Sequence, residues 1–541
     1  MTARRLDFAS ARRSWLISVN AALVAFAVAA SSFFWVAPSP ALLLGPSVEE
    51  VSDAITELEV DKARALIGKL DADSTGAAIE RARLSLYVGD CDTAQATLAS
   101  LTGVKEAAPL ADLAKNCARA TAGSVVIEDK EHDLWIRLQD ESDRVLLPLL
   151  ADVAVKARAA IVRDLGIELP KPLRIDLVRD LFSLSAVSGL PLQAAETTGT
   201  VAVARWGRVN MISPRAATLG GGYPWEDTLQ HEMTHLALSH ATRDQAPLWL
   251  QEGLAKRQET RWRPPRPFDG DPAPDEVAQN ALLTGESVGI DQLGPSIAML
   301  PSADAASIAF AEVSSFIEYW IKVNGQPALR LLFQDLKGLG TNEASRALES
   351  ASGYDLSGWI VRWQDYLRHL PPPKGAPLDQ VVHREPISLR ERARQIRTGE
   401  LLLARGRAGQ AVERFRVALS AEPHDAAVRF RLGKSLIEAG DVASGAPLFE
   451  SVKDVDVGNP GWFALAGRYR RDKGDPEANS FFDWAVAIDP YLEEAACEGR
   501  FASPSISQNG ASSAAPPKVP EIPEAPERRA LCESARKIPR D

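Results

Sequence analysis

The stretch that decides the fold reads His231-Glu232-Met233-Thr234-His235 and is followed by Pro247-Leu248-Trp249-Leu250-Gln251-Glu252-Gly253-Leu254-Ala255. Its first five residues form an HExxH motif. On a helix, side chains four residues apart project from the same side, so His231 and His235 can bind one Zn²⁺. Glu232 then lies where it can take a proton from an attacking water molecule. The alternative is a pair of ordinary surface histidines on an amphipathic helix.

A third ligand is needed, because a catalytic zinc ion takes three protein ligands and keeps one position open. Pro247 suits the first turn of a new helix, which would carry Glu252 in an otherwise apolar run. A carboxylate there is costly to bury without a partner, and a metal ion supplies one. The residues therefore predict His231, His235 and Glu252 as zinc ligands and Glu232 as the general base.

His240 is a weaker candidate for the third ligand. It follows His231 by about 900° of helical rotation and so lies on the opposite face of a straight helix. In the metzincin arrangement a histidine follows the second ligand at a fixed distance with a glycine midway, but this chain has Ala241 and Leu238 at those positions. We therefore exclude the metzincin class.

Together these two segments resemble the peptidase MA-like gluzincins, which are distant relatives of thermolysin. The resemblance covers roughly residues 123 to 370 and includes the runs Phe310-Ala311, Ser315-Phe316-Ile317-Glu318-Tyr319-Trp320, Gly325-Gln326-Pro327-Ala328-Leu329-Arg330 and Trp363-Gln364-Asp365-Tyr366-Leu367. It implies an α+β zincin-like metallopeptidase domain in which His231, His235 and Glu252 hold the metal and Glu232 is the base. It also implies Zn²⁺ as cofactor and a peptide or protein as substrate.

The resemblance further implies an edge strand, here Arg208–Ile212, that pairs with an extended peptide. At Phe310 relatives often carry a tyrosine, so a phenolic donor to the tetrahedral intermediate is missing at this position. Tyr319 or His240 are the candidates to replace it, and the sequence does not decide between them. Reduced activity, or none, therefore stays open as an alternative.

Composition excludes several classes of protein. The chain has 541 residues, of which 45% are apolar and 25% charged, as in ordinary globular proteins. This excludes a polytopic membrane protein, a collagen-like fibre and a wholly disordered chain. The formal net charge of −11 leaves no large basic face, so we expect no nucleic-acid partner.

Residues 15–37 form an uncharged, mostly apolar run that is long enough for the ~20-residue helix that crosses a bilayer. Four arginines precede it: Arg4, Arg5, Arg12 and Arg13. Because such an excess keeps its side of the membrane cytoplasmic, we predict a cytoplasmic segment at 1–14 and a single transmembrane helix at 15–37. The rest would face the periplasm from a bacterial inner membrane. The alternative is a signal peptide cut after Ala27-Val28-Ala29 or near Ala37, which would release a secreted protein.

Helical patterns flank the metallopeptidase domain. Residues 48–122 have a TPR-like pattern, because Ala63-Arg64-Ala65-Leu66 recurs as Ala94-Gln95-Ala96-Thr97. We assign residues 123–370 to the metallopeptidase domain and residues 371–391 to a linker. The remaining segments are TPR repeats at 392–492 and a disordered Pro/Ala-rich tail at 503–541.

The repeats at 392–492 are predicted from spacing. Three units show small and apolar residues at matching offsets: Gly399, Ala411, Phe415, Ala418 and Pro423; then Leu432, Gly433 and Phe449; then Gly467, Phe482, Ala485 and Pro490. Small residues at these positions let two antiparallel helices approach closely. We expect stacked helical hairpins with a concave groove that binds a protein partner.

All four cysteines follow the predicted anchor, and an even number in an exported protein suggests pairs. Proximity favours Cys91 with Cys117 and Cys497 with Cys532. In the chain-entropy model each bridge would stabilise the fold by about 3–4 kcal/mol. Four unpaired cysteines are the alternative.

The sequence therefore favours a membrane-anchored, periplasm-facing zinc metallopeptidase that hydrolyses peptide bonds by a metal-activated water. The alternative is an envelope scaffold of weak or no activity that binds protein partners through its TPR repeats. Substrate, cleavage specificity and the choice between endo- and exopeptidase stay open.

The anchor is testable with a reporter domain fused after residue 60. If residues 15–37 cross the membrane with the N-terminus in the cytoplasm, a reporter that works only outside the cytoplasm should be active and should fractionate with membranes. Recovery of a soluble form that begins near Ala30 or just after Ala37 would instead identify a cleaved signal.

Overall fold

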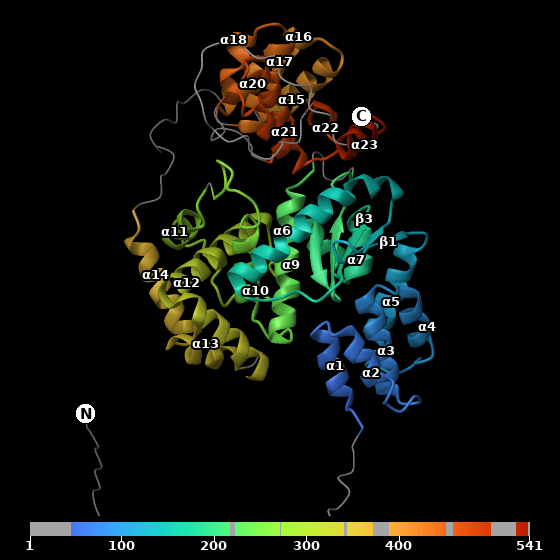
Figure 1. The fold of residues 1–541 in the computed structure, drawn as a ribbon. Coiled ribbons are helices and arrows are strands. Elements are labelled where there is room, and N and C mark those ends of the chain that lie inside the picture. Colours follow the sequence, from blue (N-terminus) through green and yellow to red (C-terminus); the bar gives the residue numbers. More distant parts are fainter. Residues whose placement is uncertain are drawn as a thin grey trace, which may run out of the picture. The chain divides into compact units, whose positions relative to one another are not determined.

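The computed structural model describes residues 45–216, 222–270, 272–339, 343–371, 389–423, 425–450, 458–498 and 526–538. Over these ranges the chain is mostly helical with one small mixed sheet, which agrees with an α+β domain flanked by helical segments (Figure 1). The predicted cytoplasmic segment and anchor, residues 1–37, lie outside the described residues. Among the helices that are described, none is both long and apolar enough to span a bilayer.

Five short helices open the described chain. They are α1 (Val48–Thr56), α2 (Val60–Ile67), α3 (Thr75–Val88), α4 (Cys91–Ala99) and α5 (Ala108–Thr121), called the N-terminal helices below. Ala63 and Ala94, which open the two copies of the repeated alanine pattern, are both fully buried. Ser47 caps α1 through a reciprocal pair of hydrogen bonds with Glu50. Helices therefore fill the range in which the sequence predicts them.

The sheet has five strands in the order β1-β2-β3-β5-β4. The strands are β1 (Val125–Asp129), β2 (Leu134–Leu138), β3 (Leu173–Val178), β4 (Ala202–Arg205) and β5 (Arg208–Ile212). β2, β3 and β5 run parallel to one another, while β1 and β4 are antiparallel to their neighbours. One edge of the sheet is therefore β4.

The prediction that Arg208–Ile212 is the edge strand is wrong. This strand is β5, which lies between β3 and β4, and all five of its residues are buried. Burial on both faces is typical of an interior strand. β4 and β5 form a hairpin around Trp206-Gly207, where both residues have positive φ, as a tight two-residue turn requires. The hairpin is visible in the sequence, but the strand of the pair that joins β3 is not.

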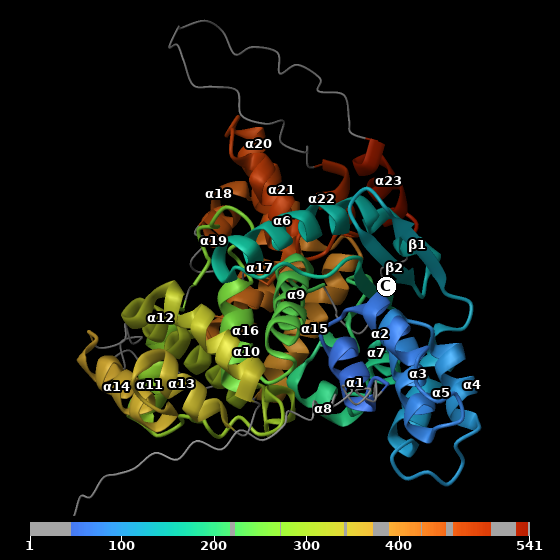
Figure 2. The ribbon, with the colours of Figure 1, turned by 60° about the horizontal axis from the view of Figure 1, so that its bottom comes forward.

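Helices cover both faces of the sheet (Figure 1, Figure 2). On one face, η1 (Glu141–Leu146) and α6 (Leu147–Leu165) share a core with α9 (Trp225–Thr242) and with sheet residues such as Ile175 and Met211. On the other face, α7 (Leu181–Ser188) packs with the N-terminal helices, and α8 (Leu192–Thr198) leads into β4. Gly166 has a left-handed φ of 71° and caps the C-terminal end of α6.

The chain after α9 is helical up to residue 371 in the ranges that the structure describes. It contains α10 (Leu248–Gln258), α11 (Pro274–Thr284), η3 (Ile297–Met299), α12 (Ala303–Leu339), α13 (Ala344–Ser352) and α14 (Leu356–His369). α12 is broken at Gly325, whose φ of 77° is not helical, just before Pro327. Trp320 of α12 and Trp363 of α14 are buried in the same core as residues of the motif helix α9. These two helices therefore help to hold α9 in place.

The repeat region begins at α15 (Leu389–Ala404). It continues with α16 (Ala408–Ala421), α17 (Ala426–Glu438), α18 (Val442–Gly445), α19 (Pro447–Glu450), α20 (Pro460–Asp472), α21 (Ala478–Val486) and α22 (Glu493–Glu498). Gly399 faces the ring of Phe415 in the first helical pair, and Gly467 faces Phe482 in the last. The predicted small residues therefore lie at helix crossings. In the middle unit two short helices, α18 and α19, replace the second long helix.

The last repeat packs against the start of the motif helix. Tyr223 donates its backbone N–H to the carbonyl of Ile488 at 3.0 Å, and Trp225 donates its indole N–H to the carbonyl of Val486 at 3.2 Å. A Cβ at Gly222 would lie 2.2 Å from the Ile488 carbonyl oxygen, so only glycine allows this approach. The third repeat and the α+β domain thus share one core.

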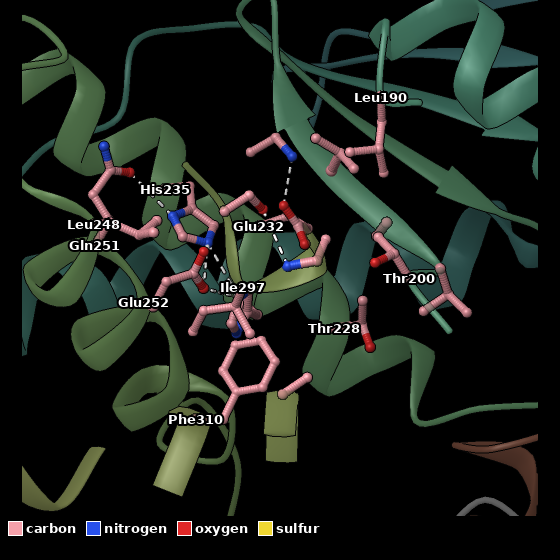
Figure 3. Close-up of a pocket in the computed structure, with 18 of the residues that line it drawn as sticks. Leu190, Thr200, Thr228, Glu232, His235, Leu248, Gln251, Glu252, Ile297 and Phe310 are labelled. Atoms are coloured by element: carbon pink, nitrogen blue, oxygen red, sulfur yellow. Dashed lines mark hydrogen bonds and ion pairs between the residues drawn. The ribbon is translucent and has the colours of Figure 1, made fainter. Parts of the chain in front are cut away.

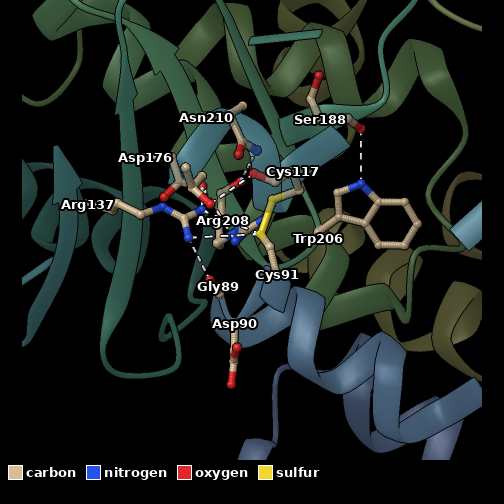
Figure 4. The surroundings of a disulfide bond; sticks show 12 residues. Gly89, Asp90, Cys91, Cys117, Arg137, Asp176, Ser188, Trp206, Arg208 and Asn210 are labelled. Atoms are coloured by element: carbon tan, nitrogen blue, oxygen red, sulfur yellow. Dashed lines mark hydrogen bonds and ion pairs between the residues drawn. A yellow bond between two sulfur atoms is a disulfide. The ribbon is translucent and has the colours of Figure 1, made fainter. Parts of the chain in front are cut away.

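Both predicted disulfides are confirmed: Cys91–Cys117 joins α4 to α5 (Figure 4), and Cys497–Cys532 joins α22 to α23 (Pro526–Ala535).

The prediction of a disordered tail over 503–541 is wrong for residues 526–538, which form α23 and the turn after it. The reason is local: Pro526 is suited to a first helical turn, good helix formers follow it, and the disulfide ties the helix to α22.

Two glycine substitutions test the helix crossing of the first repeat. A Cβ at Gly399 would lie 2.7 Å from the ring of Phe415, which is fully buried, whereas a Cβ at Gly409 meets nothing within 4 Å. Both glycines are helical, so alanine should gain about 0.5–1 kcal/mol at Gly409. At Gly399 overpacking should reverse the sign, at a cost of about 1–3 kcal/mol. Hydrogen exchange of the α15–α16 peptides in the full chain should speed up for Gly399→Ala and slow for Gly409→Ala. Equal protection in both variants would contradict the crossing.

Candidate metal centre

The HExxH motif lies in the middle of α9, and Glu252 lies on α10, which runs back beside it. The reversal uses Arg243 and Asp244, both with positive φ, and Pro247 caps the start of α10. Arg243 ends α9 in a left-handed conformation. Because the chain turns back within a few residues, Glu252 comes to lie opposite the histidine face of α9.

The structure brings the three predicted ligands together, and Figure 3 shows two of them, His235 and Glu252, facing each other. The Nε2 atoms of His231 and His235 are 3.1 Å apart, and Oε2 of Glu252 lies 3.5 Å from the first and 3.6 Å from the second. Within the described residues these three form the one group of histidine, cysteine or carboxylate side chains whose donor atoms could hold a metal ion. Donors at about 2.0–2.2 Å from a tetrahedral zinc ion lie about 3.3–3.6 Å from one another. The donor set therefore fits such an ion.

Each imidazole is oriented by a second partner. Nδ1 of His231 donates to Oε1 of Glu259 at 2.9 Å, and Lys256 binds the other oxygen of that carboxylate at 2.7 Å. Nδ1 of His235 donates to Oε1 of Gln251 at 3.2 Å. With Nδ1 carrying the proton, Nε2 of each ring is left as the ligand atom.

Glu259 and Gln251 are not among the site residues predicted from the sequence. For Glu259 the sequence does hold an indication, since it follows Glu252 by about two helical turns and so falls on the same face of α10. Gln251 carries no such indication, because a glutamine beside a ligand has many other uses. Their roles follow only from the way α10 packs on α9.

The electrostatics of the cluster favour a positive charge between the three side chains. Burial alone would lower the pKa of His231, but hydrogen bonds to Glu252 and Glu259 raise it to about 10. Burial opposes protonation of His235 as well, yet the charge of Glu252 raises its pKa. In turn, burial would raise the pKa of Glu252, but the two imidazoles hold it well below its usual range. A divalent cation supplies the same positive charge.

Glu232 lies beside the donor cluster and is held by the edge strand. Its side chain is buried, and one carboxylate oxygen accepts the backbone N–H of Ala204 in β4. Burial raises the pKa of Glu232, against the nearby imidazoles that lower it. The predicted base on α9 is thus held in place by the edge strand β4.

A cavity of about 450 Å³ opens onto these groups. Its walls come from β4 and the residues before it, from α9 and α10, and from Ile297 of η3 and Phe310 of α12 (Figure 3). The ring of Phe310 packs edge-on against His231, with centroids 6.1 Å apart. The phenyl ring of Phe310 therefore lies next to the His231 ligand, at the position where relatives often carry a tyrosine.

Neither candidate replacement for the missing phenol reaches this cavity. Tyr319 stacks on Tyr366 with ring centroids 4.9 Å apart, and Nδ1 of His240 hydrogen-bonds the backbone carbonyl of Glu57 at 2.6 Å. Among the described residues that line the cavity there is no tyrosine. The proposed substitution of the phenol by Tyr319 or His240 is therefore wrong.

Comparison with known families agrees with this geometry. Residues 153–369 match the family described as the Peptidase MA superfamily, and residues 402–469 match the family described as Tetratricopeptide repeat. The chain therefore contains a Peptidase MA superfamily domain, which includes β4, α9, α10 and α12, and a tetratricopeptide repeat after it. Peptidases of this superfamily are typically metal-dependent. No curated protein matches the chain.

Metal content should respond to the donors and to their partners. Glu252→Ala removes a donor atom and should abolish tight zinc binding. Glu259→Gln keeps all three donors but weakens the orientation of His231, so zinc affinity should fall about 10–100-fold. The matched control is His240→Ala, which should leave the affinity unchanged because this imidazole contacts Glu57. Chelator competition and elemental analysis measure all three. Wild-type protein without zinc would refute the ligand assignment.

Proposed function

We propose that this chain is a zinc-dependent metallopeptidase that hydrolyses peptide bonds. One observation carries the proposal: two histidines and a glutamate converge at tetrahedral spacing beside a buried glutamate, in a cavity bordered by an unpaired strand edge. Metal-assisted hydrolysis needs these parts, namely three ligands, a base and a surface that holds the substrate.

The chain's own residues divide the work. When bound, zinc would supply Lewis acidity to the reacting water and to the scissile carbonyl. Glu259 and Gln251 hold the imidazoles so that Nε2 faces the ion. Glu232 takes the proton from the attacking water and delivers it to the leaving amine. Its hydrogen bond to Ala204 keeps the carboxylate aimed at the cavity.

Substrate would bind as an added strand beside β4. In the hairpin, Val201 accepts a hydrogen bond from Ile212, and Val203 pairs with Asn210. Because alternate residues of an antiparallel strand face opposite ways, the backbone groups of Ala202 and Ala204 point away from β5. The N–H of Ala204 is used by Glu232, but the carbonyl of Ala204 and the backbone groups of Ala202 border the cavity and can pair with an extended peptide.

The location proposed for the protein is the periplasmic side of a bacterial inner membrane. It is supported by the uncharged run at 15–37 with arginines before it. Two disulfides in the folded part fit an oxidising compartment. We further propose that the tetratricopeptide repeats bind a protein partner or substrate, since such repeats expose extended concave surfaces.

A second candidate function is an envelope scaffold of little or no activity. The observation in its favour is Phe310, which puts a phenyl ring where a phenol would help to stabilise the oxyanion. The intact donor set and the buried Glu232 favour the enzyme.

A single substitution separates the two functions. Glu232→Gln leaves the three donors in place, so zinc should stay bound while turnover of a mixed peptide library falls by about 10²–10⁴-fold. Glu226→Gln is the matched control, since Glu226 lies on the same helix but pairs with Arg266 away from the donors. Zinc-loaded wild-type protein that cleaves nothing, and binds the same partners as Glu232→Gln, would favour the scaffold.

A further inference from the structure

The cavity that opens onto the donor cluster extends along α9. The wall residues of α9 that lie farthest apart are Thr228 and Ser239. With a rise of about 1.5 Å per helical residue they are separated by about 16 Å, a distance that an extended strand covers with about five residues. A peptide bound in this cavity therefore has about five residues inside it, and the two ends of the cavity decide whether the chain can continue.

The edge strand β4 lies along the same length of the cavity. Thr200, just before β4, lies on the same side of Glu232 as Thr228 (Figure 3). Near the other end of β4, Ala204 lines a second cavity of about 260 Å³ together with Ser239. A substrate strand that pairs with β4 in the antiparallel sense, the commoner arrangement, would have its C-terminal end beside Thr200 and its N-terminal end at the second cavity.

Where β4 begins, the two sides of the cleft are in contact with each other. α8 leads into β4 on the sheet side, η3 leads into α12 on the helical side, and α8 packs against η3. Ala195 of α8 and Ile297 of η3 are both buried. The chain before η3 is held to α12, because the buried carboxylate of Glu312 accepts hydrogen bonds from the hydroxyl of Ser287 and the backbone N–H of Gly289. The contact between α8 and η3 therefore crosses the cleft at the end where the C-terminus of a substrate would lie.

At the hairpin end the N-terminal helices form the last wall of the second cavity. Leu58, after α1, and Tyr87 of α3 line it opposite Trp206 and Gly207, at the tip of the β4–β5 hairpin. The rings of Tyr87 and Trp206 meet edge to face, with centroids 6.0 Å apart. A Cβ at Gly207 would lie 2.8 Å from Tyr87 and 2.9 Å from Leu58, so the hairpin tip fits closely against these helices.

The N-terminal helices are also attached to the helical side of the cleft. The backbone carbonyl of Glu57 hydrogen-bonds His240 of α9 at 2.6 Å. The buried carboxylate of Glu57 pairs with Arg243 and, at 3.2 Å, with Lys337 of α12. These helices therefore connect the β4–β5 hairpin with α9 and α12, and the second cavity ends against them.

We propose that the substrates of this cleft are short peptides of about five to eight residues, and that folded proteins and long unfolded chains are excluded. Each end of the cleft is crossed by a contact between its two sides, so a longer chain has no path onward while its backbone pairs with β4. The second cavity leaves room only for a short N-terminal extension. This inference rests on the proposed peptidase function and specifies its substrate class.

Substrate length is the variable that tests the proposal. Zinc-loaded protein is incubated with random-sequence peptides of about 6, 12 and 24 residues, and the products are identified by mass spectrometry. We expect kcat/KM for the shortest peptides to exceed that for the longest by about tenfold or more, because a chain that overruns the cleft holds its scissile bond poorly at the donors. Equal values at all three lengths, or efficient cleavage of an unfolded protein, would overturn the proposal.

The wall at the hairpin end can be altered at Leu58. Its φ of 59° suits glycine better than leucine, so Leu58→Gly removes the side chain that meets Gly207 without straining the backbone. A short peptide that the protein cleaves is then lengthened with glycine and serine at either end. We expect Leu58→Gly to accept a longer N-terminal extension than the wild type, with the limit at the C-terminal end unchanged.

The matched control is Leu66→Ala, which shortens a side chain that packs against the same hydrophobic cluster as Leu58 but does not line the cavity. It should keep both limits. If Leu58→Gly moved neither limit, or moved both equally, the N-terminal helices would not set the length of the substrate and the proposal would fail.

Binding separates this proposal from the peptidase function. Fluorescence anisotropy with labelled short and long peptides and zinc-loaded Glu232→Gln protein measures the length limit without turnover. Tighter binding of the short peptide, with no cleavage by zinc-loaded wild-type protein, would contradict the peptidase function alone. Equal binding at both lengths, together with cleavage by the wild type, would contradict the length limit alone.

Discussion

The structure depends on one constraint: two imidazoles and a carboxylate must be held a few ångströms apart inside the protein. Glu252 is costly to bury without a counter-charge, and the geometry that supplies one tolerates little movement. The chain meets this requirement by placing both histidines on one helix and the glutamate on the next. The short turn through Arg243 and Asp244 joins them. Because both histidines lie in the middle of α9, packing that fixes this part of the helix also fixes the candidate metal centre.

α9 is fixed by segments that lie far from it in the sequence. Its start is bound by the third repeat, through the carbonyls of Val486 and Ile488. At its end, His240 is bound by the carbonyl of Glu57, just after α1. At its middle, Glu232 takes the backbone N–H of Ala204 in β4. The helical segments on either side of the Peptidase MA superfamily domain are thus supports of α9 as well as candidate binding surfaces.

Local chemistry explains what could be predicted from the sequence. The HExxH motif, the helix ended by Gly166, the hairpin around Trp206-Gly207 and the small residues at the repeat crossings each depend on residues close in the chain. So does Glu252, because the short turn between α9 and α10 leaves few places for a third ligand. The local pattern of the fold and all four central residues of the site follow from such signals.

What could not be predicted depends on non-local pairing. Arg208–Ile212 is predicted at the sheet edge, yet it lies inside the sheet because it pairs with β3. The two strands are separated in the sequence by a whole crossover connection, so their pairing cannot be read from local residues. Gln251 and Glu259 gain their roles only from the packing of α10 on α9. The third repeat and α9 lie on opposite sides of the predicted linker at 371–391, whose composition indicates two separate domains. The contact between them shows that they pack together, which the composition could not predict.

The charges around the donor cluster favour one divalent cation. Glu232, Glu252 and Glu259 surround the donor cluster, and the ammonium group of Lys256 offsets Glu259. The two carboxylates that remain match the charge of one divalent cation at the donors.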